Sequence, residues 1–303
     1  MADKPTYFDI KLLFPVLDHK GWPEGKNYMK FWAEGAACTA DNDTKLGKAT
    51  ITANVGNSCM RIYKVDWNWL FGFKLAVDNY QIFSRQKVFN TAALTQLVRS
   101  YGGLSRPGVK SVKFNQWLTN NLEPDVFRKN IAEHQIQHLK VSPGVNDPEK
   151  FDDLIAALNN FAYYSMYKGE VFNGAEYQKL NKSVCPAIRL PGIAPKEAED
   201  AVSRLLSGQY KALLYIEDVG VYMGDIYEFN GDQYLATWDI KNKKVFQSKI
   251  DYVFDGQDFD DPTDITVTNA TYQIYRRETG KGGDFMALTP MKLLGFKRLI
   301  PIK

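Results

Sequence analysis

The sequence predicts an α+β fold, with a mixed α/β N-terminal part and a mostly antiparallel β C-terminal part. Apolar residues recur with helical spacing at several places before residue 208, whereas short strand-like runs separated by turn residues follow it. The 303 residues are 45% hydrophobic and 14% aromatic, which is enough to bury a large core. We expect a mixed region over residues 1–208 and a β-rich region over 209–303, with one continuous domain as the alternative.

Helices are predicted where apolar residues recur every three or four positions between cap residues. The clearest helix in the front of the chain covers residues 24–35, because Pro23 stands near its start and large apolar side chains follow at helical spacing. Residues 195–207 form a second one, with acidic residues early and Gly208 after its end. Shorter helices are predicted over residues 92–101, 115–122 and 124–139, and a helix or turn over 147–160.

Four segments of the N-terminal part are predicted as strands. Residues 50–55 and 60–65 show β-branched alternation and are expected to pair. Residues 66–73 are rich in aromatic side chains, which is typical of a strand buried on both faces, so we place them in the middle of a sheet. Residues 161–172 contain several Tyr residues and form the fourth strand.

The C-terminal part is predicted as a small antiparallel sheet. Its strands cover residues 212–222, 234–238, 244–250, 265–275 and 285–288. The turns that join them are Asn230-Gly231, the polar residues 241–243 and the glycine-rich residues 280–283. Short connections of this kind favour antiparallel pairing.

The charge balance argues against a nucleic-acid partner. The chain has 38 Lys and Arg against 35 Asp and Glu, which leaves a net charge of only +3. A protein that binds phosphate backbones is expected to be much more basic.

The sequence also bears on the compartment. The apolar run over residues 12–17 contains Pro15 and is too short for a signal-peptide core. No segment approaches the length of a transmembrane helix. Cys38, Cys59 and Cys185 are odd in number and widely spaced, as expected of reduced thiols. We expect a protein made in the cytoplasm, without a transmembrane segment, and secretion without a signal peptide stays open.

Two patterns raise the question of a metal ion. His134 and His138 are four residues apart on a predicted helix, but only His19 remains as a third imidazole. The loop over residues 255–264 carries five Asp residues without the spacing of a calcium-binding loop. We predict solvated side chains in both places and no cofactor, and a metal ion at either is the alternative left open.

The densest combination of polar and aromatic residues lies in the C-terminal part. We select five of its residues as a candidate catalytic set: Asp225, Tyr227, Glu228, Arg277 and Asp284. Carboxylates, a phenol and a cation suit general acid–base work on a phosphoryl or glycosidic bond, with Arg277 and Lys281 stabilising developing negative charge. The alternative is a turn with acidic caps and an arginine paired to a carboxylate for structure. Whether the chain is an enzyme stays open.

Short motifs spread over most of the chain form a recognisable pattern. They are Phe8-Asp-Ile, Gly21-Trp-Pro, Val65-Asp-Trp-Asn-Trp-Leu, Lys168-Gly-Glu-Val-Phe, Asp225-Ile-Tyr-Glu-Phe and Gly282-Gly-Asp-Phe. The last two are similar to Asp-x-Tyr-Asp-Phe and Gly-Gly-Asp-Phe segments, and the chain as a whole resembles a family of uncharacterised Gram-negative bacterial proteins, a domain of unknown function.

Such proteins are often associated with type VI secretion loci. The resemblance therefore implies a secretion-associated antibacterial effector that acts on a cell-envelope component through its C-terminal region. The partners it implies are an immunity protein or a secretion-system component. The alternative is a non-enzymatic binding or adaptor protein of a secretion system.

The Asp-x-Tyr-Asp stem is also similar to that of the lipid II-cleaving colicin M-like toxins, which continue with a His-Arg pair. Here Glu228 replaces the second Asp and no His follows His138. The phosphodiesterase activity of those toxins is therefore not carried over to this chain.

Overall fold

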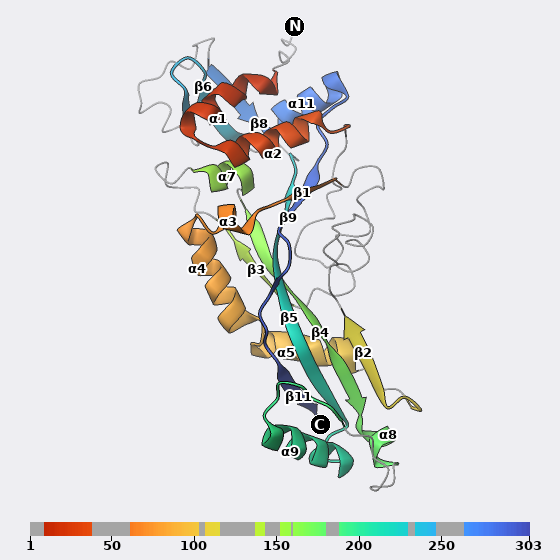
Figure 1. Cartoon of the computed structure of the whole chain (residues 1–303). Helices are drawn as coiled ribbons and strands as arrows, with labels where there is room; N and C mark the ends of the chain where they lie inside the picture. The colour runs from red at the N-terminus through yellow and green to blue at the C-terminus, as the bar shows by residue number, and fades with distance from the viewer. Residues whose placement is uncertain are drawn as a thin grey trace. The chain divides into compact units, whose positions relative to one another are not determined.

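The fold is mixed α+β, as predicted (Figure 1). The computed structural model describes residues 9–37, 61–102, 107–115, 137–142, 152–158, 160–179, 188–229, 234–246 and 264–303. The chain divides into two compact units: the first unit comprises residues 1–77, 140–162 and 223–289, and the second unit comprises residues 78–139, 163–222 and 290–303. The boundary expected at residue 208 stays a prediction.

The first unit contains helices from the start, middle and end of the chain. They are η1 (Ile10–Leu13), α1 (Phe14–Lys20), α2 (Pro23–Glu34), α3 (Trp67–Leu70), α7 (Asp153–Leu158) and α11 (Asn269–Thr279). Its strands are β1 (Arg61–Lys64), β6 (Tyr234–Asp239), β7 (Lys244–Phe246), β8 (Asp264–Thr268) and β9 (Phe285–Leu288). The helix predicted over 24–35 and the strands predicted over 60–65, 234–238 and 285–288 are confirmed.

Two sheets organise the first unit. In one, β9 lies between β1, which runs parallel to it, and the end of β5 (Ala212–Tyr227), which runs antiparallel. In the other, β6 lies between β7 and β8, and both pairings are antiparallel. Helix α2 covers one face of the first of these sheets, because Tyr28 and Phe31 lie with their ring centroids 5.6 and 4.9 Å from that of Phe285.

The second unit is built on two long strands, β4 (Phe161–Asn173) and β5, of which β4 starts and β5 ends in the first unit. Strand β2 (Ser111–Asn115) pairs with β4, while β10 (Lys292–Leu293) and β11 (Arg298–Ile302) pair with β5.

The helical segments of the second unit are η2 (Phe83–Lys87), α5 (Thr91–Gly102), α8 (Gly174–Gln178) and α9 (Pro195–Leu206). The bounds of α4 (Lys74–Ile82) and β3 (Gln137–Val141) cross from one unit to the other. Leu205 of α9 packs in a buried cluster with Leu213 of β5. The helices predicted over 92–101 and 195–207 and the strand over 161–172 are confirmed.

The prediction of a central strand over residues 66–73 is wrong, because this segment begins with helix α3. Asp66 is the N-cap, and its carboxylate accepts a hydrogen bond from the Asn68 backbone N–H at 2.8 Å. Asp is among the strongest N-cap residues. Trp67 and Phe71 then contact each other one turn apart, with ring centroids separated by 4.9 Å. Aromatic content alone does not distinguish a buried strand from a capped helical turn.

The strand predicted over residues 265–275 is only half correct, because strand β8 ends at Thr268 and helix α11 follows. Thr268 is the N-cap in a reciprocal capping box with Thr271, and Gly280 ends the helix with a left-handed φ of 67°. The five predicted tail strands do not form one sheet either, since β9 pairs with β1 and β5 while β6, β7 and β8 pair among themselves. The antiparallel pairing predicted across the turn over residues 241–243 is confirmed for β6 and β7, whereas β9 pairs with β1 from the N-terminal part of the chain.

Two more predicted helices are wrong where the structure describes them. Residues 137–139, the end of the helix predicted over 124–139, begin β3, and the helix predicted over 115–122 starts on the last residue of β2. The strand predicted over 50–55 and the Asn230-Gly231 turn lie outside the described residues.

Helix α2 takes its N-terminal cap from a residue that is distant in sequence. The Asp153 carboxylate accepts hydrogen bonds from the backbone N–H groups of Glu24 and Gly25 at 3.2 and 2.7 Å. The Trp69 indole N–H donates to the same carboxylate at 3.0 Å. Helix α2 and helix α7, which carries Asp153, approach so closely here that a Cβ on Gly25 would lie 2.7 Å from the Cβ of Ala156. The negative charge also faces the positive end of the α2 dipole, which adds to its stabilising effect.

We predict that Asp153→Ala lowers the free energy of unfolding by about 2–3 kcal/mol, because the three donors lose a buried charged acceptor. Urea denaturation followed by circular dichroism measures the change. Asp18→Ala is the control, because Asp18 forms an exposed ion pair with Lys26, and it should lower the same quantity by less than about 1 kcal/mol. Equal losses in the two variants would contradict the capping role.

Candidate functional site

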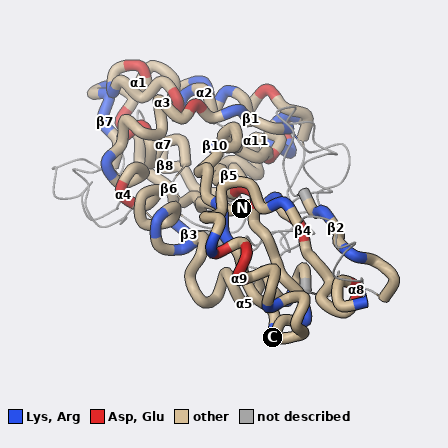
Figure 2. Tube along the Cα trace, turned by 60° about the horizontal axis from the view of Figure 1, so that its bottom comes forward, with Lys and Arg blue, Asp and Glu red and all other residues tan. Residues whose placement is uncertain are grey.

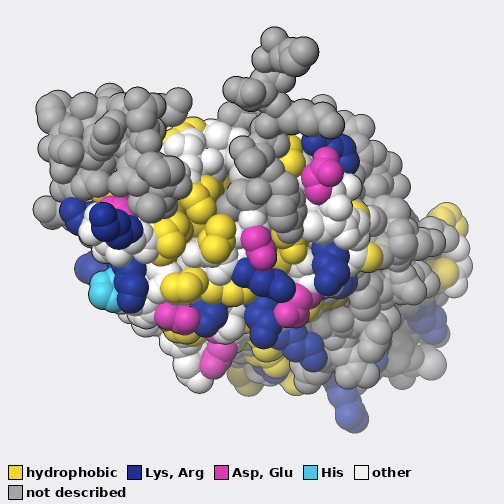
Figure 3. All heavy atoms as spheres, turned by 90° about the horizontal axis from the view of Figure 1, so that it is seen from above, with side chains coloured by type: hydrophobic (Ala, Val, Ile, Leu, Met, Phe, Trp, Pro, Cys, Tyr) yellow, Lys and Arg dark blue, Asp and Glu magenta, His cyan; other side chains and the backbone are white. Residues whose placement is uncertain are grey.

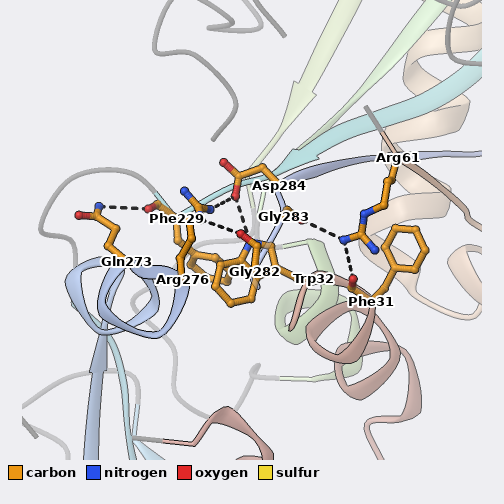
Figure 4. Close-up of polar contacts among 9 residues, drawn as sticks. All are labelled: Phe31, Trp32, Arg61, Phe229, Gln273, Arg276, Gly282, Gly283 and Asp284. Carbon is orange, nitrogen blue, oxygen red and sulfur yellow. Dashed lines mark hydrogen bonds and ion pairs between the residues drawn. The ribbon is translucent and has the colours of Figure 1, made fainter. Parts of the chain in front are cut away.

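Asp284, one of the five predicted site residues, is the centre of a buried ion pair (Figure 4). Its Oδ1 accepts hydrogen bonds from Arg276 Nη2 and from the Trp32 indole N–H, the latter at 3.0 Å. Arg276 Nε also donates to the Gly282 carbonyl oxygen at 2.6 Å. The exposed fraction of the side chain is only 1% for Asp284 and 10% for Arg276. The charge of this carboxylate is therefore neutralised within a structural network.

The turn between α11 and β9 attaches the C-terminal end of α2. The Gly283 N–H donates to the Trp32 carbonyl oxygen at 3.1 Å. Gly282 has a φ of +93°, and a Cβ there would lie 2.5 Å from the Trp32 ring, so this position requires glycine. From β1, Arg61 Nη2 donates to the carbonyl oxygens of Phe31 and Gly283 at 2.6 and 3.1 Å (Figure 4). Helix α2 is thus bound to the turn by backbone and side-chain contacts together.

The predicted cation Arg277 takes no part in this network. Its side chain is 69% exposed and donates to the carboxylate of the neighbouring Glu278 at 3.0 Å. Glu228 and Lys281 are exposed as well. Adjacent residues of a helix lie on different sides of it, so the buried position belongs to Arg276 and the exposed one to Arg277. The arginine that pairs with Asp284 is therefore Arg276 and not the predicted Arg277.

Asp225 and Tyr227 lie on the sheet face that α2 covers. Asp225 pairs across strands with Ala287, which pairs in turn with Tyr63. Residues paired across neighbouring strands lie on the same face of a sheet, and so do residues two positions apart on one strand. Asp225, Tyr227 and Tyr63 therefore all lie on the face that α2 covers. The Tyr28 ring of α2 lies against it, with centroids 4.5 Å from Tyr63 and 5.7 Å from Tyr227. We call Asp225, Tyr227, Tyr63 and Tyr28 the Asp225 cluster.

The Asp225 carboxyl group is in an unusual environment, because only 8% of the residue is exposed. Burial raises its pKa well above the usual range for aspartate, and the charge of Glu228 raises it further. The Ile226 backbone N–H and the Lys140 ammonium group act in the opposite direction. The site therefore favours the protonated carboxyl group, which can donate a hydrogen bond.

The tyrosines of the cluster are not equivalent. The Tyr28 hydroxyl is buried and has no hydrogen-bond partner among the described residues. Burial raises the pKa of this phenol, and Asp225 raises it further. The Tyr63 hydroxyl instead donates to the Glu24 carboxylate at 2.8 Å. A protonated carboxyl and an unpaired phenol could act as proton donors to a ligand, provided that α2 let one reach them.

Tyr28, Tyr63 and Arg276 are not among the site residues predicted from the sequence. Tyr28 falls in a helical stripe of apolar residues, a pattern that indicates core and gives no sign of a nearby carboxyl group. A signal for Arg276 does exist: Thr268 and Gly280 bound a helical segment, and a helix there would place adjacent arginines on different sides.

Metal ligation is limited in the described residues. They contain no group of three or more His, Cys, Asp or Glu side chains that could hold a metal ion. His138 lies in β3, so the helical spacing predicted for it with His134 is wrong at that residue, and His134 lies outside the described residues. Of the acidic loop over residues 255–264, only Asp264 is described.

Within the described ranges, no helix is both long enough and apolar enough to cross a membrane.

These features define a mixed α+β protein whose first unit buries an aspartate–arginine pair and, within the Asp225 cluster, the side chains of Asp225 and Tyr28. A family model matches residues 8–303, and the chain belongs to that family, described as a family of unknown function (DUF6402). No curated protein and no solved structure matches the chain. The resemblance to a family of uncharacterised proteins is thus confirmed, while the association with Gram-negative bacteria and type VI secretion loci stays a prediction.

We predict that Arg276→Ala lowers the free energy of unfolding by about 3–5 kcal/mol, because it leaves the Asp284 carboxylate buried without its partner. Arg277→Ala is the matched control on the next residue of the same helix, and its exposed pair with Glu278 should contribute less than about 1 kcal/mol. Urea denaturation of both variants gives the comparison. Losses of similar size would argue against the structural role of the ion pair.

The raised pKa of Asp225 links stability to pH. The unfolded chain has an ordinary aspartate pKa of ~3.9, so the stability that protonation contributes is fully present below that pH and is lost as pH rises through the folded pKa. The Asp225→Asn variant cannot ionise at this position. We predict that its free energy of unfolding at pH ~8 is higher than that of the wild type by about 1–2 kcal/mol. Its free energy of unfolding should also not show the wild-type decrease with rising pH that Asp225 causes. Urea midpoints measured from pH ~4 to ~8 test this, and identical pH profiles would contradict it.

Proposed function

We propose that the chain is a non-enzymatic binding or adaptor protein whose partner is a secretion-system component. The observation that carries the proposal is that two of the five residues selected as a catalytic set, Asp284 and Arg277, are each engaged in an ion pair with a residue outside the set. Asp284 is neutralised by Arg276, and Arg277 is paired with Glu278 at the surface. General acid–base catalysis requires groups that converge on a reacting atom, and this distribution favours a structural use of the same residues.

The choice of partner rests on the sequence. The motifs that resemble proteins associated with type VI secretion loci support a component of such a system. The net charge of +3 supports a protein partner over a nucleic acid. Synthesis in the cytoplasm, expected from the sequence, is compatible with an adaptor that meets its partner there.

A second candidate function is favoured by one observation, the Asp225 cluster. In this second candidate function, the chain is an antibacterial effector that acts on a cell-envelope component and is blocked by an immunity protein. Paired groups with perturbed pKa values are frequent in active sites, and both Asp225 and Tyr28 have raised pKa values. In this case Asp225 would be the general acid, and α2 would have to move to admit a substrate.

Bacterial growth distinguishes the two functions. We predict that cells that produce the chain, either in the cytoplasm or in the periplasm through an added signal peptide, grow like cells with an empty vector. Asp225→Asn and Tyr227→Phe should leave growth unchanged, and Arg277→Ala serves as the surface control. Periplasmic growth inhibition that both site variants abolish without loss of stability would overturn the proposal in favour of the effector.

Co-purification of a partner tests the proposed binding function directly. A tagged chain produced in a bacterium with a type VI locus should co-purify with a secretion-system component. Recovery should be equal for the wild type and Asp225→Asn, because a binding function does not require the carboxylate. Recovery that depends on Asp225 would contradict the proposal.

A further inference from the structure

The C-terminal segment of the second unit combines exposed apolar side chains with positive charge only. Residues 290–303 contain Lys and Arg but no Asp or Glu. Leu293 on β10 and Phe296 in the turn after it are 54% and 41% exposed. Elsewhere the two signs are mixed: Figure 2 shows Lys and Arg interspersed with Asp and Glu along the described trace, and hydrophobic side chains on the face in Figure 3 are bordered by both.

The turn that carries this segment is fixed by its backbone. Gly295 has a left-handed φ of 67°, and its N–H donates to Asp218 Oδ1 at 3.0 Å. The Leu294 N–H donates to the Val219 carbonyl oxygen of β5 at 2.9 Å. Asp218 also accepts from the Val219 N–H at 2.8 Å, so this nearby carboxylate is engaged with backbone donors. The exposed side chains therefore stand on a rigid support, which lowers the entropy cost of binding.

Two exposed cations are held in place beside the apolar side chains. The Arg298 guanidinium lies 5.3 Å from the centre of the Phe89 ring, and that ring lies 6.3 Å from the ring of Phe296. The aliphatic part of Lys297 lies over Gly192, since a Cβ there would be 2.4 Å from Lys297 Cδ. Stacking on an aromatic ring orients the planar guanidinium group and leaves its N–H groups able to bind a carboxylate. We call Leu293, Phe296, Lys297, Arg298 and Phe89 the C-terminal surface.

We propose that the C-terminal surface docks an acidic peptide segment of the partner that also carries a large apolar side chain. Carboxylates of the segment bind Arg298 and Lys297, and its apolar side chain packs against Phe296 and Leu293. Exposed apolar groups beside an oriented arginine are typical of protein interfaces. This inference rests on the proposed binding function and specifies the chemistry of its partner.

Peptide selection on the full-length chain tests the proposal. Phage-displayed random peptides should be enriched for sequences with Asp or Glu next to Leu, Phe or Trp. A fluorescein-labelled copy of the most enriched peptide is then titrated by fluorescence anisotropy. We predict that Arg298→Glu and Phe296→Ser each weaken its binding by at least about tenfold. The control is Lys110→Glu, an exposed cation beside Asn173 at the end of β4, which should bind like the wild type.

A charge swap adds a readout that misfolding could not produce. A peptide with Lys in place of its acidic residues should bind Arg298→Glu more tightly than the wild type. Absence of acidic peptides from the selection, unchanged affinity in both variants, or tighter binding of duplex DNA or phosphatidylglycerol vesicles would overturn the inference. If the secretion-system component still co-purifies with Arg298→Glu, this surface is not its docking site but the binding function stands. Failure of the binding function itself is detected by Asp225-dependent growth inhibition.

Discussion

The buried pair of Asp284 and Arg276 is the interaction on which the first unit depends. It joins strand β9 to helix α11, and the Trp32 indole N–H adds helix α2 to the same carboxylate. Removing two charges from water is costly, and the cost is offset only in part by the hydrogen bonds that the pair makes. Here the Gly282 carbonyl oxygen accepts from Arg276 Nε, while Arg276 Nη1 is buried without a hydrogen-bond partner among the described residues. The closeness of Trp32 to Gly282 excludes any side chain at that position. The pair specifies where α2 ends more than it adds net stability.

Helix α2 is held at both ends, and this determines the environment of Asp225. At its start, Asp153 accepts hydrogen bonds from two of its backbone N–H groups, and at its end the turn between α11 and β9 binds the Trp32 carbonyl. Between these anchors, Tyr28 lies against the sheet face that carries Asp225 and Tyr227. The raised pKa of Asp225 follows first from this burial and only then from nearby charges. The raised pKa of Asp225 is therefore explained by the packing of α2 over the sheet and does not require a catalytic role.

The two units use charge differently, and the difference bears on function. The first unit buries an ion pair and the Asp225 carboxyl group, whereas the second unit keeps Lys297 and Arg298 exposed next to Phe296. An enzyme requires reactive groups that converge in an accessible cleft, while a binding protein requires a rigid scaffold with an exposed complementary surface. The binding function proposed above rests on the exposed surface of the second unit. Among the described residues, the Asp225 cluster is where the alternative, an effector, would have its general acid.

By itself, the sequence determined the fold class, the two helices near residues 24–35 and 195–207 that begin with Pro, and the strand over 161–172. A tail carboxylate paired with an arginine was the alternative to the catalytic set that the sequence favoured. These features depend on signals that act over one or two turns, such as caps, spacing and turn residues. Only the tertiary structure decided that the arginine is Arg276 and not Arg277, because the two differ only in which face of α11 is buried. It also decided that β9 pairs with β1 and that Asp225 lies on the sheet face against which Tyr28 packs. Strand pairing and desolvation depend on segments from distant parts of the chain, which no local pattern can specify.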